Sequence, residues 1–418
     1  MNRLLATVLV GALVGLLAGG AGAYPLDGYK RTGIARLYAF KQVEKSLVSK
    51  GQLKPGATLS TRKVKLRLLD QPELELPKPD PELSKRIREL LGADAAAYGV
   101  GILDLSDPDR PRYGEVNGLK AQQPGSVGKI MVLVAFFQAL ADAFPDTGDR
   151  ERILRETVIT ANELIRRDTH NVPIYAVGDP RVERRPIREG EQANLWTYLD
   201  WMVSASSNAA ASMVIAQVLL LKKFGASYPV SSGKADDYLR KTSRGELSRA
   251  LANALVPPLK RSGINPAHLQ QGSFFTREGR SRAASAGSTA TARELVRYCL
   301  RMEQGKLVDR WSSLEIKRLL YLTDIRIRYA SSPALDSSAV YFKSGSLYEC
   351  KPEKGFECRK FHGNVRNYMN SVTLVETSGR RSLHYVAAVL SNVLRKDSKG
   401  MHVSLAGEIH RMMQASRR

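Results

Sequence analysis

The stretch that decides the fold of this chain is residues 122–140, QQPGSVGKIMVLVAFFQAL. The breaker run QQPG precedes Ser126 and an apolar run follows Lys129, which predicts a loop leading into a buried helix with Ser126 in its first turn. Because residues i and i+3 share a helix face, the Lys129 amine can reach the Ser126 hydroxyl. Serine is a weak nucleophile until a base takes its proton, and an amine whose pKa is lowered in an apolar site is such a base. The stretch therefore predicts a serine nucleophile activated by a lysine.

The same Ser-x-x-Lys spacing recurs at residues 231–234, SSGK, but the polar run ADDY follows it. Because no apolar stretch is present to bury this second lysine, we expect residues 231–234 to form a loop without a catalytic role.

Two further motifs follow in order. Ser206-Ser207-Asn208 separates the amphipathic residues 195–203 from the small apolar run 209–216, and Lys343-Ser344-Gly345 ends a β-like run, residues 339–342. Each has an ordinary interpretation by itself, a break between helices and a strand that ends in a turn. In the order Ser-x-x-Lys, Ser-x-Asn, Lys-Ser-Gly they form the motif set of the β-lactamases and penicillin-binding proteins. The chain resembles this superfamily of penicillin-recognising serine enzymes, and class A β-lactamases most closely, over residues 83–413.

The resemblance implies an α+β fold of the β-lactamase/transpeptidase type, in which an antiparallel sheet packs against helices beside a helical block. The local patterns agree with it: strands are expected at 97–105 and 112–116, and apolar runs lie at 371–376 and 385–391. A capped helix start is expected within 288–295, and an amphipathic helix at 403–413.

The resemblance also implies an acyl-enzyme mechanism. Ser126 would attack a carbonyl, with Lys129 as the first candidate to take its proton. Ser206, aided by Lys343, would pass a proton to the leaving nitrogen. Asn208 would hold the substrate amide and Lys129.

Substrate binding would fall to the residues of the third motif and the one after it, Ser344, Gly345 and Ser346. The Lys343 charge and the Ser344 hydroxyl would bind a substrate carboxylate. The backbone N–H groups of Ser126 and Ser346 would form the oxyanion hole.

The chain departs from the class A pattern at one position. Class A enzymes carry a Glu, with an Asn shortly after it, on a loop before the helix start that residues 288–295 resemble, and this Glu activates the deacylating water. The corresponding stretch here is residues 270–280, QQGSFFTREGR, where Glu278 is the one acid and no Asn follows it. Glu278 is either a displaced deacylation base or, as we favour, a solvated carboxylate beside Arg277 or Arg280.

Three hypotheses for function remain open. The leading one is a class A β-lactamase-like serine hydrolase that forms a Ser126 acyl-enzyme on β-lactams or related amides, with slow deacylation if the Glu is missing. The second is a cell-wall D-Ala-D-Ala carboxypeptidase or transpeptidase of the penicillin-binding type. The third is a non-catalytic binding protein on the same fold, against which the intact nucleophile set argues.

The N-terminus predicts export. Met1-Asn2-Arg3 is a short basic start, residues 4–17 are apolar, and Ala21-Gly22-Ala23 is a small-x-small cleavage site. A transmembrane anchor is the alternative, but the apolar run is short and no basic stop-transfer signal follows. We expect a signal peptide at 1–23 and a periplasmic or secreted protein.

The three cysteines fit an oxidising compartment. Cys350 and Cys358 flank a turn-rich segment, residues 351–357, and are expected to form a disulfide. Cys299 lies in an apolar helix pattern and is expected to be a core thiol. We expect no metal site, because the six histidines show no ligand spacing with the cysteines, and no cofactor is implied.

The remaining features concern domains and charge. Residues 24–80 depart from the catalytic family and end in the Pro-rich run 76–81, so we expect an N-terminal appendage and stiff linker before a catalytic domain at 81–418. The net charge is +23. Export and the scattered basic residues argue against nucleic acid, which leaves contact with anionic cell wall or membrane, or a merely soluble basic surface.

Overall fold

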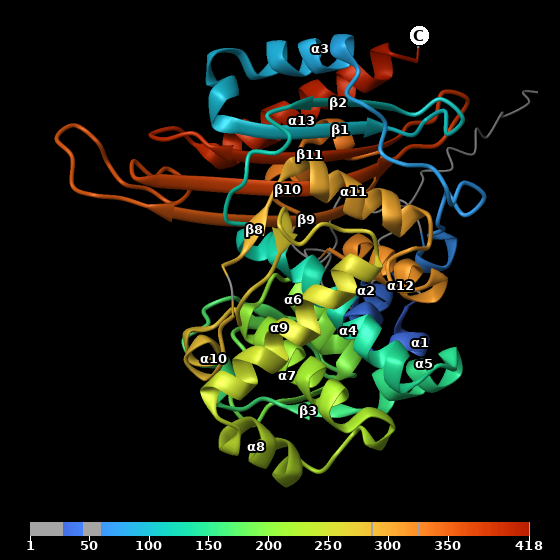
Figure 1. Cartoon of the computed structure of the whole chain (residues 1–418), viewed down its shortest axis with the longest axis vertical. Helices are drawn as coiled ribbons and strands as arrows, with labels where there is room; N and C mark the ends of the chain where they lie inside the picture. Colours follow the sequence, from blue (N-terminus) through green and yellow to red (C-terminus); the bar gives the residue numbers. More distant parts are fainter. Residues whose placement is uncertain (1–27, 45–59, 286, 324–325, 418) are drawn as a thin grey trace, which may run out of the picture.

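The computed structural model describes residues 28–44, 60–285, 287–323 and 326–417. The predicted signal peptide, residues 1–23, lies outside the described residues. Figure 1 shows two parts along the long axis of the molecule. A β-sheet with its covering helices forms the upper half, and a helical block forms the lower half. The expected α+β arrangement is confirmed.

The sheet has five antiparallel strands in the order β2-β1-β11-β10-β9. Their bounds are β1 Tyr98–Asp104, β2 Arg112–Val116, β9 Ala339–Glu349, β10 Arg366–Glu376 and β11 His384–Asn392. The pairing of β1 with β11 joins the two ends of the catalytic region. Strand β9 is one edge of this sheet and β2 the other, so within the described part of the chain one side of the β9 backbone pairs with no strand.

Both faces of the sheet are buried. Successive side chains on a strand point to opposite faces, so alternate residues of one strand belong to different core clusters. On β11, Ala387 and Val389 pack with α3 (Pro81–Leu91) and α13 (Ser398–Ala415). Val386, Ala388 and Leu390 belong to the other core cluster, together with residues of α11 (Ala292–Glu303). This explains why the β10 and β11 sequences are apolar runs rather than alternating ones.

The helical block is built around α4 (Lys129–Ala143) and α7 (Asn208–Phe224), which pack on each other. Both are long and apolar enough to cross a membrane, but 72% and 67% of their apolar windows are buried in the protein, as expected of core helices. Around them lie α5 Thr147–Glu156, α6 Leu195–Val203, α8 Ser232–Lys241, α9 Arg244–Arg261, α10 Arg277–Arg282 and α12 Arg310–Tyr321.

Short strands and 3₁₀ turns complete the described part of the chain. Three two-stranded ribbons pair β3 (Val158–Thr160) with β6 (Gln192–Asn194), β4 (Val172–Ile174) with β5 (Glu183–Arg185), and β7 (Leu269–Gln270) with β8 (Thr289–Ala290). The 3₁₀ turns are η2 Thr61–Lys63, η3 Gly92–Ala97, η4 Gly125–Gly128, η5 Glu163–Ile165, η6 Gly225–Ser227, η7 Arg328–Ser331 and η8 Pro333–Leu335.

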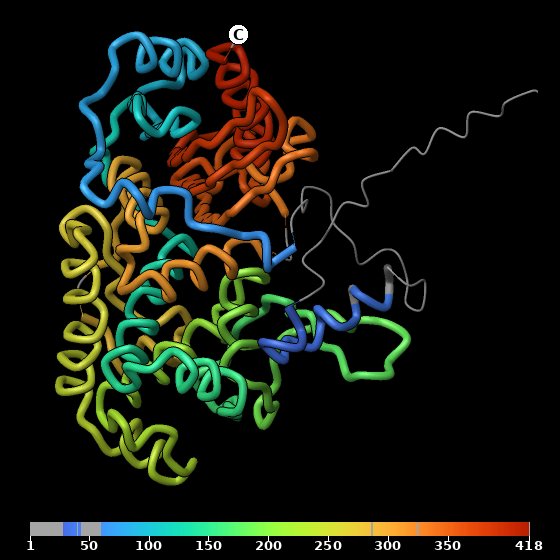
Figure 2. The backbone as a smooth tube through the Cα atoms, turned by 90° about the vertical axis from the view of Figure 1, so that its right-hand side faces the viewer, coloured from blue at the N-terminus to red at the C-terminus, as the bar shows by residue number. Residues whose placement is uncertain are grey.

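The N-terminal segment packs on both halves of the molecule. Its helices α1 (Tyr29–Thr32) and α2 (Ala35–Glu44) lie against the helical block, where Arg36 forms a buried ion pair with Asp200 of α6. Residues 60–80 then run along the molecule to α3, as Figure 2 shows. There the Arg67 and Leu68 amides donate to the side chain and the backbone carbonyl of Glu303 on α11.

Two local expectations, on residues 231–234 and on the end of the strand through Lys343, were wrong. Residues 231–234 begin α8 rather than forming a loop, because the Ser231 side chain caps the helix by accepting from the Lys234 amide. By contrast, the capped helix start expected within 288–295 is confirmed, with Thr291 at the cap and Glu294 in the first turn. The strand through Lys343 does not end at Gly345 but continues to Glu349, because β10 continues to pair with it.

Candidate active site

Ser126 lies in the 3₁₀ turn η4, which leads directly into α4. Gly125 has φ +53°, a left-handed conformation that glycine adopts without a steric penalty. The turn lies against β9: a Cβ on Gly345 would come within 2.4 Å of the Pro124 carbonyl oxygen and 2.6 Å of the Ser126 nitrogen. Glycine at 345 therefore permits this close approach and brings the third motif beside the first.

The Lys129 amine lies at the centre of the site and is fully buried. Its Nζ is 2.8 Å from Ser126 Oγ, 2.8 Å from Asn208 Oδ1 and 2.6 Å from the Ser206 carbonyl oxygen. The last two atoms only accept, so a neutral amine can donate to both and direct its lone pair at the Ser126 hydroxyl. Burial lowers the pKa of Lys129 to about 7, against a raising effect of the Asp168 charge. A substantial fraction of Lys129 is therefore available as a base near neutral pH.

Ser206 connects Lys129 to the third motif. It has φ +61°, a conformation that is strained for a residue with a side chain and that recurs at functional sites. This turn between α6 and α7 directs the Ser206 carbonyl at Lys129 while its Oγ accepts from Lys343 Nζ at 2.8 Å. The Ser206 hydroxyl is thus placed between the two lysines, 3.5 Å from Lys129 Nζ.

Lys343, on β9, is buried and donates to Ser206 Oγ and to the Ser344 carbonyl oxygen. Burial, together with the positive charges of Lys129 and Arg328, lowers its pKa well below the ordinary lysine value. Arg328 donates to the Ser344 and Ser346 hydroxyls, each at 2.8 Å. The two cations therefore flank the position where the sequence predicted a substrate carboxylate.

Asp168 and His170 support the second motif. Asp168 accepts from the Ser207 hydroxyl and the Ala209 amide at the start of α7. Its other oxygen lies 2.6 Å from His170 Nδ1. Burial would raise the pKa of Asp168, but these hydrogen bonds together lower it, so the carboxylate stays ionised. It thereby fixes the helix end that carries Asn208.

These groups open into one cavity of about 720 Å³, within the range of small-molecule sites. Its lining includes Ser126, Ser206, Asn208, Lys343, Ser344 and Ser346. It also includes the cations Arg280, Arg328, Lys360 and Lys399. Among the described residues that line it, none is Asp or Glu, and His170 is the one histidine. The cavity is therefore strongly basic.

The segment expected to carry a deacylation base forms one wall of the cavity, but without its acid. Gln271, Ser273, Phe274 and Phe275 line the cavity, and the Phe275 ring lies 4.9 Å from Lys129 Nζ. Glu278 lies in the first turn of α10 and is not among the lining residues. The structure thus brings Ser126, Lys129, Ser206, Asn208 and Lys343 together and leaves Glu278 apart from them.

No sequence motif predicted the roles of Arg328, Asp168 and Phe275 in the site. Arg328 belongs to none of the motifs and is one of 64 basic residues, so its residue type carried no signal. Asp168 and His170 lie in the insertion between the first two motifs. Only the packing of this insertion on α7 shows their role.

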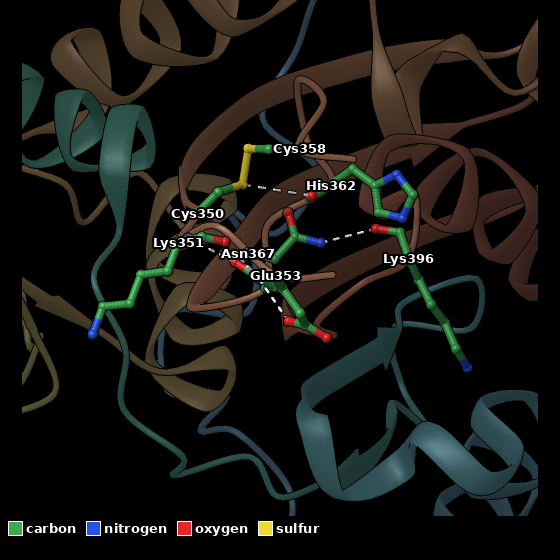
Figure 3. The surroundings of a disulfide bond; sticks show 8 residues. Cys350, Lys351, Glu353, Cys358, His362, Asn367 and Lys396 are labelled. Carbon is green, nitrogen blue, oxygen red and sulfur yellow. Dashed lines mark hydrogen bonds between the residues drawn. A yellow bond between two sulfur atoms is a disulfide. The ribbon is translucent and has the colours of Figure 1, made fainter. Parts of the chain in front are cut away.

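The disulfide expected between Cys350 and Cys358 is formed, at the tip of the β9–β10 hairpin (Figure 3). Cys299 is buried in α11, as expected, and burial raises the pKa of its thiol.

Glu303, Glu376 and His384 form a cluster that could hold a metal ion. However, the buried Lys317 ammonium lies 2.5 Å from both carboxylates. Burial opposes the ionisation of Glu303, but the Lys317 charge and the contact with His384 outweigh it and lower the pKa of Glu303. We interpret the cluster as a buried ion network that also anchors the N-terminal segment, because Lys317 donates to the Lys65 carbonyl.

Comparisons with known proteins agree with the motifs and the fold. A family model described as "Beta-lactamase enzyme family" matches residues 82–390. No curated protein matches the chain.

Solved structures share the fold at low sequence identity. TLA-3 extended-spectrum β-lactamase matches with a TM-score of 0.53 and 14% identity, over 80% of this chain and 98% of that one. A mutant of PBP-A, solved as an acyl-enzyme complex with penicillin G, matches with a TM-score of 0.52 and 14% identity, over 82% and 100%. A class A β-lactamase from Bacteroides cellulosilyticus matches with a TM-score of 0.50 and 15% identity, over 81% and 100%.

Proposed function

Because this chain belongs to the Beta-lactamase enzyme family, we propose that it is a serine enzyme that forms a Ser126 acyl-enzyme on an anionic amide and hydrolyses that acyl-enzyme slowly. The observation that carries the proposal is the contact of 2.8 Å between Lys129 Nζ and Ser126 Oγ, with the pKa of Lys129 lowered by burial to about 7. A nucleophile beside a base of matched pKa is the arrangement that acyl transfer requires.

The acylation steps follow from the contacts. Neutral Lys129 takes the Ser126 proton as Oγ attacks the carbonyl carbon. By the family resemblance, the backbone N–H groups of Ser126 and Ser346, on neighbouring turn and strand, would stabilise the oxyanion. The proton then passes through the Ser206 hydroxyl to the leaving nitrogen, and Lys343 stabilises the Ser206 oxygen by donating to it.

The basic cavity supports an anionic substrate. Lys343, Arg328 and Ser344 favour a carboxylate on the substrate. The free edge of β9 can pair with an extended peptide-like backbone, as in other complexes where a peptide adds to a sheet edge. Both a β-lactam and a cell-wall peptide that ends in a carboxylate fit this description.

Slow deacylation is proposed because no carboxylate is among the described residues that line the cavity. General-base catalysis of a water attack typically contributes about 10²–10⁴-fold, which this site would lack. A D-Ala-D-Ala peptidase is therefore the second candidate, since an amine acceptor or slow hydrolysis suffices for that reaction. Export through the N-terminal signal peptide, and contact of the basic surface with an anionic cell wall, are proposed with it.

The test is incubation of the purified protein with a fluorescent penicillin, followed over time by intact-protein mass spectrometry. We expect one covalent adduct that persists for minutes or longer. Rapid loss of the adduct would show an efficient β-lactamase instead, and no adduct would refute the proposed function. Release of D-Ala from a D-Ala-D-Ala peptide would identify the peptidase.

A further inference from the structure

The β9–β10 hairpin extends beyond the catalytic residues and is tied at its tip. After β9 ends at Glu349, the Cys350–Cys358 disulfide closes the loop, and Figure 3 shows the Cys350 sulfur beside the His362 carbonyl oxygen, 3.9 Å away. The buried Asn364 side chain accepts from the Lys351 amide and donates to the Lys351 carbonyl. The disulfide and the Asn364 hydrogen bonds therefore join the start of the loop after β9 to its later residues.

The hairpin also contacts the first residue of α13 and the segment before this helix. The His362 ring contacts the Arg395 carbonyl oxygen at 2.6 Å, and Ser398 Oγ donates to the Phe361 carbonyl at 3.0 Å. Phe361, which takes part in the second of these contacts, has φ +66°. A non-glycine residue keeps this strained backbone conformation only where the surrounding structure holds it. The structure thus fixes the position of the Phe361 side chain at the cavity wall.

Aromatic and basic side chains meet at this wall. The Phe361 ring lies 4.9 Å from the Arg328 guanidinium, 5.3 Å from Lys360 Nζ and 6.1 Å from the Tyr348 ring. Leu347 and Tyr348 are each 40% exposed although they are large and apolar. All of these residues line the same cavity as Ser126.

The charges here are unbalanced. Within the described residues, Lys360 and Lys399 line the cavity and neither has a carboxylate within ion-pair distance. By contrast, Arg359 and Arg366, which do not line the cavity, pair with Glu357 and Glu349. Lys343 and Arg328 already serve one substrate carboxylate, so the two exposed lysines are available for another anionic group.

We propose that Leu347, Tyr348, Lys360, Phe361 and Lys399 form a second subsite, the hairpin subsite, that binds an aromatic or apolar arm of the substrate carrying a second carboxylate. The inference rests on the proposed function and names its substrate class, an amide that carries two carboxylates. Tyr348 lies five positions after Lys343 on β9, which is roughly 17 Å at about 3.3 Å per residue. The subsite therefore reaches from Arg328, which the Phe361 ring contacts, along β9 to Tyr348.

The experiment compares two penicillins made from 6-aminopenicillanic acid, one with a 4-carboxyphenylacetyl arm and one with the neutral 4-carbamoylphenylacetyl arm. The arms match in shape and differ in charge. The second-order rate constant of acylation is measured for each by mass spectrometry. We expect the carboxylate arm to react about two- to fivefold faster, because an exposed charge pair stabilises by a fraction of a kcal/mol to about 1 kcal/mol. High salt should reduce the preference.

Substitutions of the two lysines test whether they cause the preference for the carboxylate arm. Lys360→Gln, and more fully Lys360→Gln with Lys399→Gln, should remove the preference while the neutral arm still acylates. The matched control is Lys354→Gln, which removes an equally exposed lysine from the same loop but outside the cavity, and it should keep the wild-type preference. Equal rates for both penicillins in the wild type, or the same loss in Lys354→Gln, would overturn the hairpin subsite. Failure of both penicillins to acylate would instead overturn the proposed function.

Discussion

Arg36 and Asp200, 164 residues apart in the chain, form an ion pair that is closed to solvent, with 2.6 Å between Nη2 and Oδ1. Arg36 also donates to the Leu322 carbonyl, next to Thr323 on the cavity wall. Asp200 lies on α6, the helix that ends just before Ser206. One arginine of the N-terminal segment thus ties together two chain segments that lead into the site.

Breaking this pair should destabilise the fold. Arg36→Met leaves the Asp200 carboxylate buried without its cation, which typically costs about 3–5 kcal/mol. Chemical denaturation should show a large fall in the free energy of unfolding, and Arg36→Met with Asp200→Leu should recover much of it. Lys41→Met is the control, since Lys41 is exposed on the same helix. An Arg36→Met midpoint equal to that of the control would contradict the prediction.

Ser126→Ala should abolish covalent labelling by penicillin while the circular dichroism spectrum stays unchanged, because the hydroxyl is the proposed nucleophile. Ser231→Ala provides the matched control from the second Ser-x-x-Lys sequence. It removes only the cap of the exposed helix α8, at a cost of about 1 kcal/mol. Labelling that survives in Ser126→Ala would refute the assignment.

The rate of acylation should rise with pH through about 7, because the pKa of Lys129 is lowered to that value and only its neutral form takes the Ser126 proton. A falling limb is expected below the ordinary lysine pKa of about 10.4, since the pKa of Lys343 is also lowered and its charge binds the substrate carboxylate. Stopped-flow measurements of acylation between pH 5 and 10, at concentrations far below saturation, report these free-enzyme values. A rate independent of pH from 5 to 9 would exclude Lys129 as the base.

Glu278→Gln should change deacylation little, because Glu278 does not line the cavity. The measurement is the decay of the penicillin adduct after excess ligand is removed. A hundredfold slower decay with unchanged acylation would show that Glu278 is the base after all, and that the loop moves to present it.

The thiols offer a test of the disulfide with an internal control. Alkylation of the purified protein without reductant should leave Cys350 and Cys358 unmodified, while Cys299 reacts once the protein is unfolded. Modification of all three cysteines in the denaturant would disprove the bridge.

The sequence by itself determined the family, the nucleophile hypothesis and most elements of the sheet. These predictions depend on local signals. Ser126 and Lys129 are three residues apart, and the segments of β10 and β11 are apolar runs, which indicates buried strands. Local signals predicted that the strand through Lys343 ends at Gly345, which was wrong. The length of β9 is set by its pairing with β10, which continues to Glu349. Local signals also missed that Ser231 would cap a helix.

Only the tertiary structure decided which groups share the cavity. Lys343 reaches Ser206 across 137 residues of sequence, and Arg328 reaches the third motif from a turn that no motif marks. The packing of distant segments also decides that Gln271, Ser273, Phe274 and Phe275 line the cavity while Glu278 does not. It likewise brings Lys360 and Lys399 to the same cavity. Contacts between distant residues are set by packing of the whole core, so neither residue type nor spacing could reveal them.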